Sequence, residues 1–168
     1  LMRTIIDAAK DADVSAIIAS DVAPMSYARS IGVEVHLSTQ LNISNVEALK
    51  FYSLFADVVV LARELNLEQV SEIFKQIQEQ QIKGPNGELI RIEMFAHGAL
   101  CMAVSGKCYL SLHEMNASAN RGACMQICRR GYNVKDKESN IELDIDNQYI
   151  MSPKDLKTIH FMNKMLDA

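Results

Sequence analysis

Four short runs rich in β-branched residues recur along the first part of the chain, at 14–20, 33–38, 57–62 and 90–95. Segments with the apolar spacing of helices separate them. Regular succession of strand, helix and strand requires parallel strands, because the crossover helix returns the chain to the same end of the sheet. This repeat therefore predicts an α/β fold built on a parallel sheet.

The helical segments carry recognisable start signals. Ser44 and Glu47 have the spacing of a capping box, and Asn66 is placed to cap the following helix. Near the end of the chain, Ser152 followed by Pro153 predicts the start of another helix.

Polar residues follow each predicted strand. They are Asp21, then Ser38, Thr39 and Gln40, then Arg63 and Glu64, and finally His97. The carboxyl ends of parallel strands share one rim, where barrels place their catalytic groups. The first turn after a strand lacks the G-x-G-x-x-G pattern, which disfavours a dinucleotide-binding sheet. We therefore expect a partial TIM-like (β/α)8 barrel of about four consecutive βα units. The remainder of the barrel or a second chain would cover its sheet edges.

The composition is that of a globular protein, since 49% of the 168 residues are hydrophobic and 23% are charged. Apolar runs such as 58–62 are far shorter than the ~20 residues of a membrane span, and the first residues lack a signal-peptide pattern. We therefore expect a cytoplasmic protein without membrane contact. The net charge of −4 is uneven, because residues 101–137 hold six basic and two acidic side chains. That segment suits an anionic partner, or is a solvated charged loop.

After the fourth run the periodicity fails, and segment 98–140 is rich in Gly, Ser, Asn, Cys and Met. Its four cysteines have the spacing C-x6-C-x15-C-x3-C. Cytosolic thiols stay reduced, which disfavours disulfides, whereas clustered thiols suit a soft metal. On spacing alone an iron–sulfur cluster, a structural zinc and ordinary buried cysteines all remain open. The sequence thus predicts barrel units at 1–97, a metal-binding segment at 98–140, and a short strand with a C-terminal helix at 141–168.

One stretch resembles the signature of the collagenase-like peptidase family. Residues 93–111 match E-x-F-x-x-G-[SA]-[LIVM]-C-x4-G-x-C-x-[LIVM]-S at every fixed position. The segments HLSTQLNISN, VVLAREL, NRGACMQICRRGY and MSPKDL are also similar to segments of that family. The resemblance extends over nearly the whole chain and implies that it is the central part of a longer protein.

The resemblance implies an RNA-modifying enzyme, namely a prephenate-dependent hydroxylase of a tRNA wobble uridine or of an rRNA cytidine. It also implies a [4Fe–4S] cluster on Cys101, Cys108 and Cys124, with zinc as the alternative metal. Many relatives carry a cysteine where this chain has Lys157, so Cys128 is the local candidate for the fourth ligand. The alternatives are a peptidase, after which the family is named, and a cluster-binding partner in oxygen-independent ubiquinone hydroxylation.

The remaining polar candidates receive roles within that interpretation. We expect Arg63 to bind a carboxylate of a prephenate-like donor, Glu64 and His97 to handle protons, and the basic segment to meet tRNA or rRNA phosphate. The candidates for substrate binding are Ser38, Thr39, Gln40 and Arg129. Purely structural roles stay open, such as a salt bridge between Arg63 and Glu64 or a capping role for Ser38. A peptidase is less favoured, because no H-E-x-x-H or G-x-S-x-G pattern is present.

Overall fold

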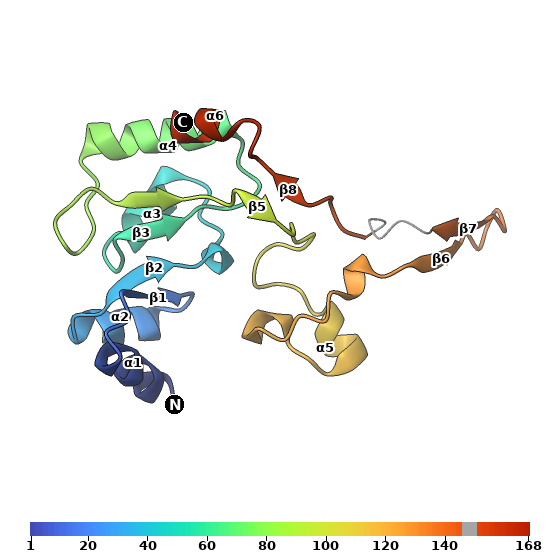
Figure 1. Cartoon of the computed structure of the whole chain (residues 1–168), viewed down its shortest axis with the longest axis horizontal. Coiled ribbons are helices and arrows are strands. Elements are labelled where there is room, and N and C mark those ends of the chain that lie inside the picture. The colour runs from blue at the N-terminus through green and yellow to red at the C-terminus, as the bar shows by residue number, and fades with distance from the viewer. Residues whose placement is uncertain (146–150) are drawn as a thin grey trace. The chain divides into compact units, whose positions relative to one another are not determined.

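The computed structural model describes residues 1–145 and 151–168. The chain forms two compact units, one of Leu1–Phe95 with Phe161–Ala168 and the other of Ala96–His160 (Figure 1). The first unit holds the alternating helices and strands. The second is mostly irregular.

A four-stranded sheet forms the centre of the first unit. Its strands are β1 (Ala16–Ala19), β2 (Glu34–Leu37), β3 (Val58–Val60) and β4 (Arg91–Glu93). They lie in the order β1-β2-β3-β4, and each neighbouring pair is parallel. The prediction of a parallel α/β sheet is confirmed, and each strand occupies the middle of its apolar run.

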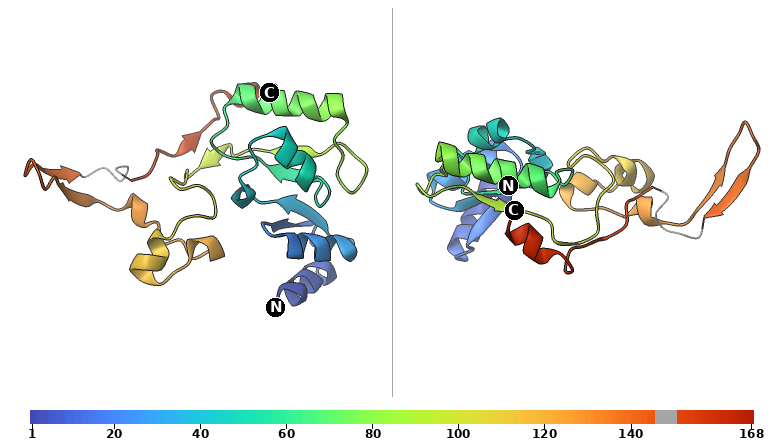
Figure 2. Two further views of the ribbon diagram at one scale, coloured as in Figure 1. Left: turned by 180° about the vertical axis from the view of Figure 1, so that it is seen from behind. Right: turned by 90° about the horizontal axis from the view of Figure 1, so that it is seen from above.

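Four helices pack on one face of this sheet. They are α1 (Met2–Asp11), α2 (Val22–Ser30), α3 (Val46–Tyr52) and α4 (Leu67–Gln80). Buried residues of all four belong to one apolar cluster with Val35, Leu37 and Val59 of the sheet. Figure 2 shows α4, in green, running beside the strands in both views. Because successive strand residues point to opposite faces, the residues that alternate with this cluster lie on the face away from these helices.

Two helix starts test the capping signals. Asn66 caps α4 as predicted, through reciprocal hydrogen bonds with Gln69 that complete a capping box. The prediction for α3 was wrong by one residue, since Asn45 rather than Ser44 accepts from the backbone N of Ala48, at 2.9 Å. Asn is at least as good a cap as Ser, so the adjacent asparagine takes this position.

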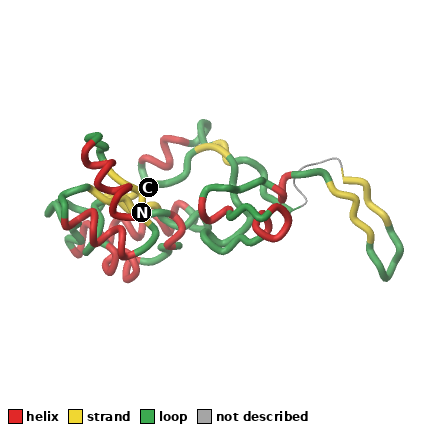
Figure 3. The backbone as a smooth tube through the Cα atoms, turned by 90° about the horizontal axis from the view of Figure 1, so that it is seen from below, coloured by secondary structure: helices red, strands yellow, loops and turns green. Residues whose placement is uncertain are grey.

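Most of the second unit is loop, drawn green in Figure 3. Strand β5 (His97–Gly98) pairs antiparallel with β8 (Leu156–Lys157), and β6 (Tyr132–Lys135) pairs antiparallel with β7 (Glu142–Ile145). The short helical elements are α5 (Leu110–Met115), η2 (Ala119–Arg121) and η3 (Ile127–Arg129).

The second unit buries few apolar side chains. Among its described residues, Ile127 is the one buried hydrophobic residue. Its buried polar residues are Ser105, Ser111, Ser152 and Thr158. A unit of this size with so small an apolar core needs a further source of stability.

The last helix starts later than the sequence predicts. Helix α6 (Met162–Leu166) belongs to the first unit, whereas Ser152 is buried in the second. A helix beginning at Ser152 was a wrong prediction, because Leu156 and Lys157 pair with β5 and Thr158 Oγ1 donates to the Ala96 carbonyl at 2.7 Å. In the described parts of the chain, we find no helix with the length and apolar character needed to cross a membrane.

Candidate functional site

The polar stretch after β2 forms a tight turn at the carboxyl end of that strand. Ser38 caps the 3-10 turn η1 (Thr39–Leu41) by accepting from the backbone N of Gln40 at 3.2 Å. The Thr39 hydroxyl is buried and has no hydrogen-bond partner among the described residues, while Gln40 is exposed. Ser38 thus has a structural role, and the substrate-binding role of all three residues stays a prediction.

The three predicted catalytic residues come from both units. Arg63 and Glu64 follow β3, and Arg63 is half-buried while Glu64 is exposed. His97 is an exposed residue of β5 in the second unit, where it pairs with Lys157. It is therefore a strand residue of the second unit rather than the end of β4. The catalytic roles of these three residues stay predictions.

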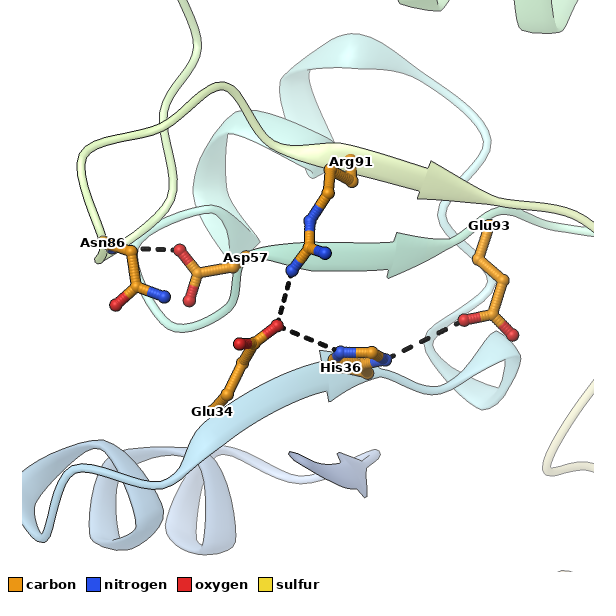
Figure 4. A network of polar contacts seen from close by, with 6 residues as sticks. All are labelled: Glu34, His36, Asp57, Asn86, Arg91 and Glu93. Carbon is orange, nitrogen blue, oxygen red and sulfur yellow. Dashed lines mark hydrogen bonds and ion pairs between the residues drawn. The ribbon is translucent and has the colours of Figure 1, made fainter. Parts of the chain in front are cut away.

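A charged network crosses β3 on the face away from helices α1 to α4 (Figure 4). Arg91 on β4 donates to Glu34 Oε1 on β2 at 2.5 Å. The same oxygen lies 3.1 Å from His36 Nε2, and His36 Nδ1 lies 3.9 Å from Glu93 Oε2 on β4. We call these four side chains, Glu34, His36, Arg91 and Glu93, the polar-face network.

Strand register brings the polar-face network together. Val58 of β3 pairs with His36 on one side and with Arg91 on the other. The longer side chains of β2 and β4 therefore reach across a short valine. The side chains of Glu34 and His36 are only 28% and 26% exposed, whereas that of Glu93 is 52% exposed. An imidazole held among carboxylates is an arrangement suited to proton transfer.

Sequence reasoning missed this network, although a signal was present. In the runs VEVHLS and IRIEMF, charged residues occupy every second position. That period places Glu34 with His36 on one face of β2, and Arg91 with Glu93 on one face of β4. Their meeting depends on β3 lying between the two strands, which the alternation alone does not specify.

The four cysteines lie in the second unit, and none of them forms a disulfide bond. Cys101 and Cys124 are exposed, whereas Cys108 and Cys128 are half-buried. Burial is the largest cause that raises the pKa of the Cys128 thiol, followed by the charges of Cys101 and Cys124. Cys108 adds to the rise and Arg129 opposes it. The other three thiols therefore lie within electrostatic range of Cys128.

The cysteines do not form a ready metal site among the described residues. Within residues 1–145 and 151–168, no group of three or more His, Cys, Asp or Glu side chains is arranged to hold a metal ion. The donor chemistry nevertheless suits a soft metal, since thiolates are the ligands of iron–sulfur clusters and of structural zinc. The small apolar core of the unit points the same way, because a bound metal commonly stabilises such units. The residues fit the group provided that the thiols draw together.

The largely buried side chain of Arg129 forms hydrogen bonds within the cysteine segment. Its side chain is only 15% exposed and donates to Asp155 Oδ1 at 2.6 Å and to the Leu100 carbonyl at 3.3 Å. Leu100 directly precedes Cys101, so the guanidinium connects a cysteine neighbour to the chain before β8. Its predicted contact with substrate stays a prediction.

The sequence of the chain is similar to that of a known family. The model of Peptidase family U32 matches residues 1–168, so the chain belongs to Peptidase family U32 and the resemblance found in its motif is confirmed. The chain is 77% identical over 168 residues to a protein of Porphyromonas gingivalis strain W83 named collagenase, covering 100% of this chain and 41% of that protein.

More distant relatives are named for RNA modification. The chain is 38% identical over 164 residues to tRNA hydroxylation protein P1 of Bacillus subtilis, covering 94% of this chain and 36% of that protein. It is 39% identical over 140 residues to a 23S rRNA 5-hydroxycytidine synthase of Escherichia coli, and the match covers 81% of this chain and 19% of that protein. The chain thus spans about two fifths or less of the length of these relatives. No solved structure matches it.

Proposed function

We propose that this protein takes part in the hydroxylation of an RNA base, either a wobble uridine of tRNA or a cytidine of rRNA, in the cytoplasm. The names of the relatives at 38% and 39% identity support this function. The structural observation that supports it is the presence of four cysteines, none of them in a disulfide, in a unit with little apolar core. Such a unit is suited to holding a redox-active metal group.

The proposed cofactor is a [4Fe–4S] cluster, with zinc as the alternative. Cys101, Cys108, Cys124 and Cys128 would hold it. When bound, the cluster would supply a redox or anchoring centre and would fix the irregular segment around it. The position at which many relatives carry a cysteine is occupied here by Lys157, a residue of β8. The fourth thiolate would therefore come from Cys128.

The first unit is proposed to be four βα units of a TIM-like barrel. Sequential parallel strands with helices α1 to α4 on one face are the arrangement of a barrel wall, whereas a doubly wound sheet has helices on both faces. The polar-face network would then lie inside the barrel. The remainder of the barrel or a second chain would pair with the outer edges of β1 and β4.

The carboxyl ends of the strands would form the substrate rim. Arg63 would bind a small carboxylate donor such as prephenate, and Ser38, Thr39 and Gln40 would contact the substrate. Glu64 and His97 are further proton-handling candidates. The basic side chains between residues 101 and 137 would meet RNA phosphate.

A peptidase is the second candidate, because the relative at 77% identity is named collagenase. We favour it less, since the sequence lacks the common nucleophile and metal motifs of peptidases. A third candidate is a non-catalytic cluster-binding partner in ubiquinone hydroxylation.

The test compares RNA from cells that lack the protein with RNA from cells complemented with it. We expect nucleoside mass spectrometry to show one hydroxylated uridine or cytidine missing in the first cells and restored in the second. Identical nucleosides in both cells, together with loss of collagen cleavage or of quinone, would overturn the proposal in favour of one of the other candidates.

A further inference from the structure

The last fixed residue of the matched signature, Ser111, is a buried serine of the second unit. It is 2% exposed and lies near the start of helix α5, three residues after Cys108. Its hydroxyl oxygen accepts a hydrogen bond from the backbone N of Met125 at 3.0 Å. Met125 directly follows Cys124, so this hydrogen bond joins the segments that carry two of the four cysteines.

Further contacts are made at the same junction. The carbonyl oxygen of Ser111 accepts from the backbone N of Ala117 at 3.2 Å, just after the end of α5. Both η2 and η3 contact α5. Cys124 lies between these two turns, and Cys128 lies within η3. Helix α5 is therefore the element against which the segment of Cys124 and Cys128 packs.

The remaining cysteine positions are joined by Arg129. This residue follows Cys128 and donates to the carbonyl oxygen of Leu100 at 3.3 Å, and Leu100 precedes Cys101. The hydrogen bond of Ser111 joins the other two positions. Two side chains that are not themselves cysteines thus connect the backbone beside all four thiols.

The chemistry of Ser111 suits a supporting role better than that of a ligand. A soft metal ion prefers thiolates to a hydroxyl group. Because Ile127 is the one buried hydrophobic residue among the described residues of this unit, little apolar packing is present to hold the cysteine segments. A buried hydrogen bond between two of these segments therefore matters more here than it would in a large apolar core.

We propose that Ser111 is a positioning residue of the cysteine site, which fixes the chain beside Cys108 relative to the chain beside Cys124 before a metal binds. This inference rests on the proposed metal centre. The cysteines do not form a ready metal site among the described residues, so a bound ion has to draw the sulfurs together. Segments that are already joined lose less conformational entropy in this step, which raises the affinity for the ion.

The first experiment measures backbone hydrogen exchange by NMR in the full chain, freed of metal and kept without oxygen. We expect S111A to exchange the Met125 amide roughly 10-fold faster, because that amide loses its acceptor. The amide of Thr158, which donates to the Ala96 carbonyl at 3.2 Å, should keep its wild-type exchange and so report that the unit stays folded. Equal exchange of Met125 in S111A and in the wild type would overturn the inference.

The matched control is S118A, the same substitution at a serine whose side chain makes no capping hydrogen bond at η2. It should leave the exchange of Met125 as in the wild type. Faster exchange of both Met125 and Thr158 in S111A would overturn the inference, since Ser111 would then support the fold of the whole unit rather than the cysteine site.

The second experiment titrates the same proteins with Co²⁺ alone, whose absorption reports how many thiolates bind it. We expect the wild type and S111A to reach the same spectrum of four thiolates. The dissociation constant of S111A should be about 10-fold higher, because groups that orient metal ligands commonly contribute 10- to 100-fold to affinity. S118A should keep the wild-type affinity.

The outcomes separate the positioning role from the metal centre. Equal affinity of S111A and the wild type, with four thiolates bound in both, would overturn the inference and leave the proposed centre standing. A wild-type protein that binds neither Co²⁺ nor, after treatment with iron and sulfide, a cluster through its thiols would overturn the proposed centre and the positioning role together.

Discussion

Arg129 is a charged residue that is largely buried in the irregular second unit. Its guanidinium donates to the Asp155 carboxylate and to the Leu100 carbonyl, and only 15% of its side chain is exposed. A fork of donors can join two separate segments, which the point charge of lysine does less well. The residue therefore positions the chain beside Cys101.

We predict that R129M loosens the segment around Leu100 and lowers the stability of the second unit by about 1 kcal/mol, a modest value because Asp155 is 51% exposed. Hydrogen exchange of peptides covering 98–108 should become faster. The neighbouring exposed residue gives the control, since R130M should leave this exchange unchanged. Equal exchange in wild type and R129M would contradict a positioning role.

At the scale of elements, the loop between α4 and β4 fixes how the edge strand joins the sheet. Asp57, buried at the start of β3, accepts from the backbone N of Asn86 at 2.9 Å, and its carbonyl accepts from the N of Arg91 at 3.0 Å. Gly84 lies directly against this aspartate. A Cβ there would stand 2.4 Å from Asp57 Oδ1 and 2.9 Å from the Ala56 carbonyl oxygen.

We predict that G84A destabilises the first unit by about 2–3 kcal/mol, because a backbone atom cannot move aside as a side chain can. Denaturant unfolding followed by circular dichroism measures this. The control G87A meets open space and bears only the strain of its φ of +83°, about 1 kcal/mol. If G84A costs no more than G87A, the close packing against Asp57 does not stabilise the sheet.

The whole molecule combines two units of unequal construction. The first has a continuous apolar core that joins helices α1 to α4 to the sheet. The second, in its described residues, buries Ile127 and several hydroxyl side chains, and its four cysteines form no disulfide. Burial of apolar surface can stabilise the first unit by itself, whereas the second needs a further stabilising element such as a bound metal.

We predict that protein purified without oxygen contains iron and sulfide, and that removing them exposes residues 96–160 to protease while the first unit resists. Limited proteolysis, with mass spectrometry of the fragments, measures the protease resistance of each unit. The control is C108S, which lacks one proposed ligand. Treating it with a metal chelator should cause little further loss of protease resistance in residues 96–160. Anaerobic protein free of iron and zinc, or equal resistance with and without metal, would contradict the proposed centre.

The sequence by itself determined the alternation of helices and strands and the family. Apolar periodicity and caps such as Asn66 act over a few residues, so they can be read locally. The same local reading misplaced the start of α3 by one residue, because Ser44 and Asn45 are competing caps. It also predicted a helix from Ser152, where pairing between β5 and β8 prevailed over local preference.

Only the tertiary structure decided which side chains meet. His36 and Glu93 are far apart in sequence, and they face each other because β3 separates their strands and sets the register. The cysteine spacing did not reveal that Cys128 is half-buried, nor that the other three thiols add to the rise of its pKa. Both results depend on contacts between distant segments, and these are fixed by packing and strand order rather than by any pattern along the chain.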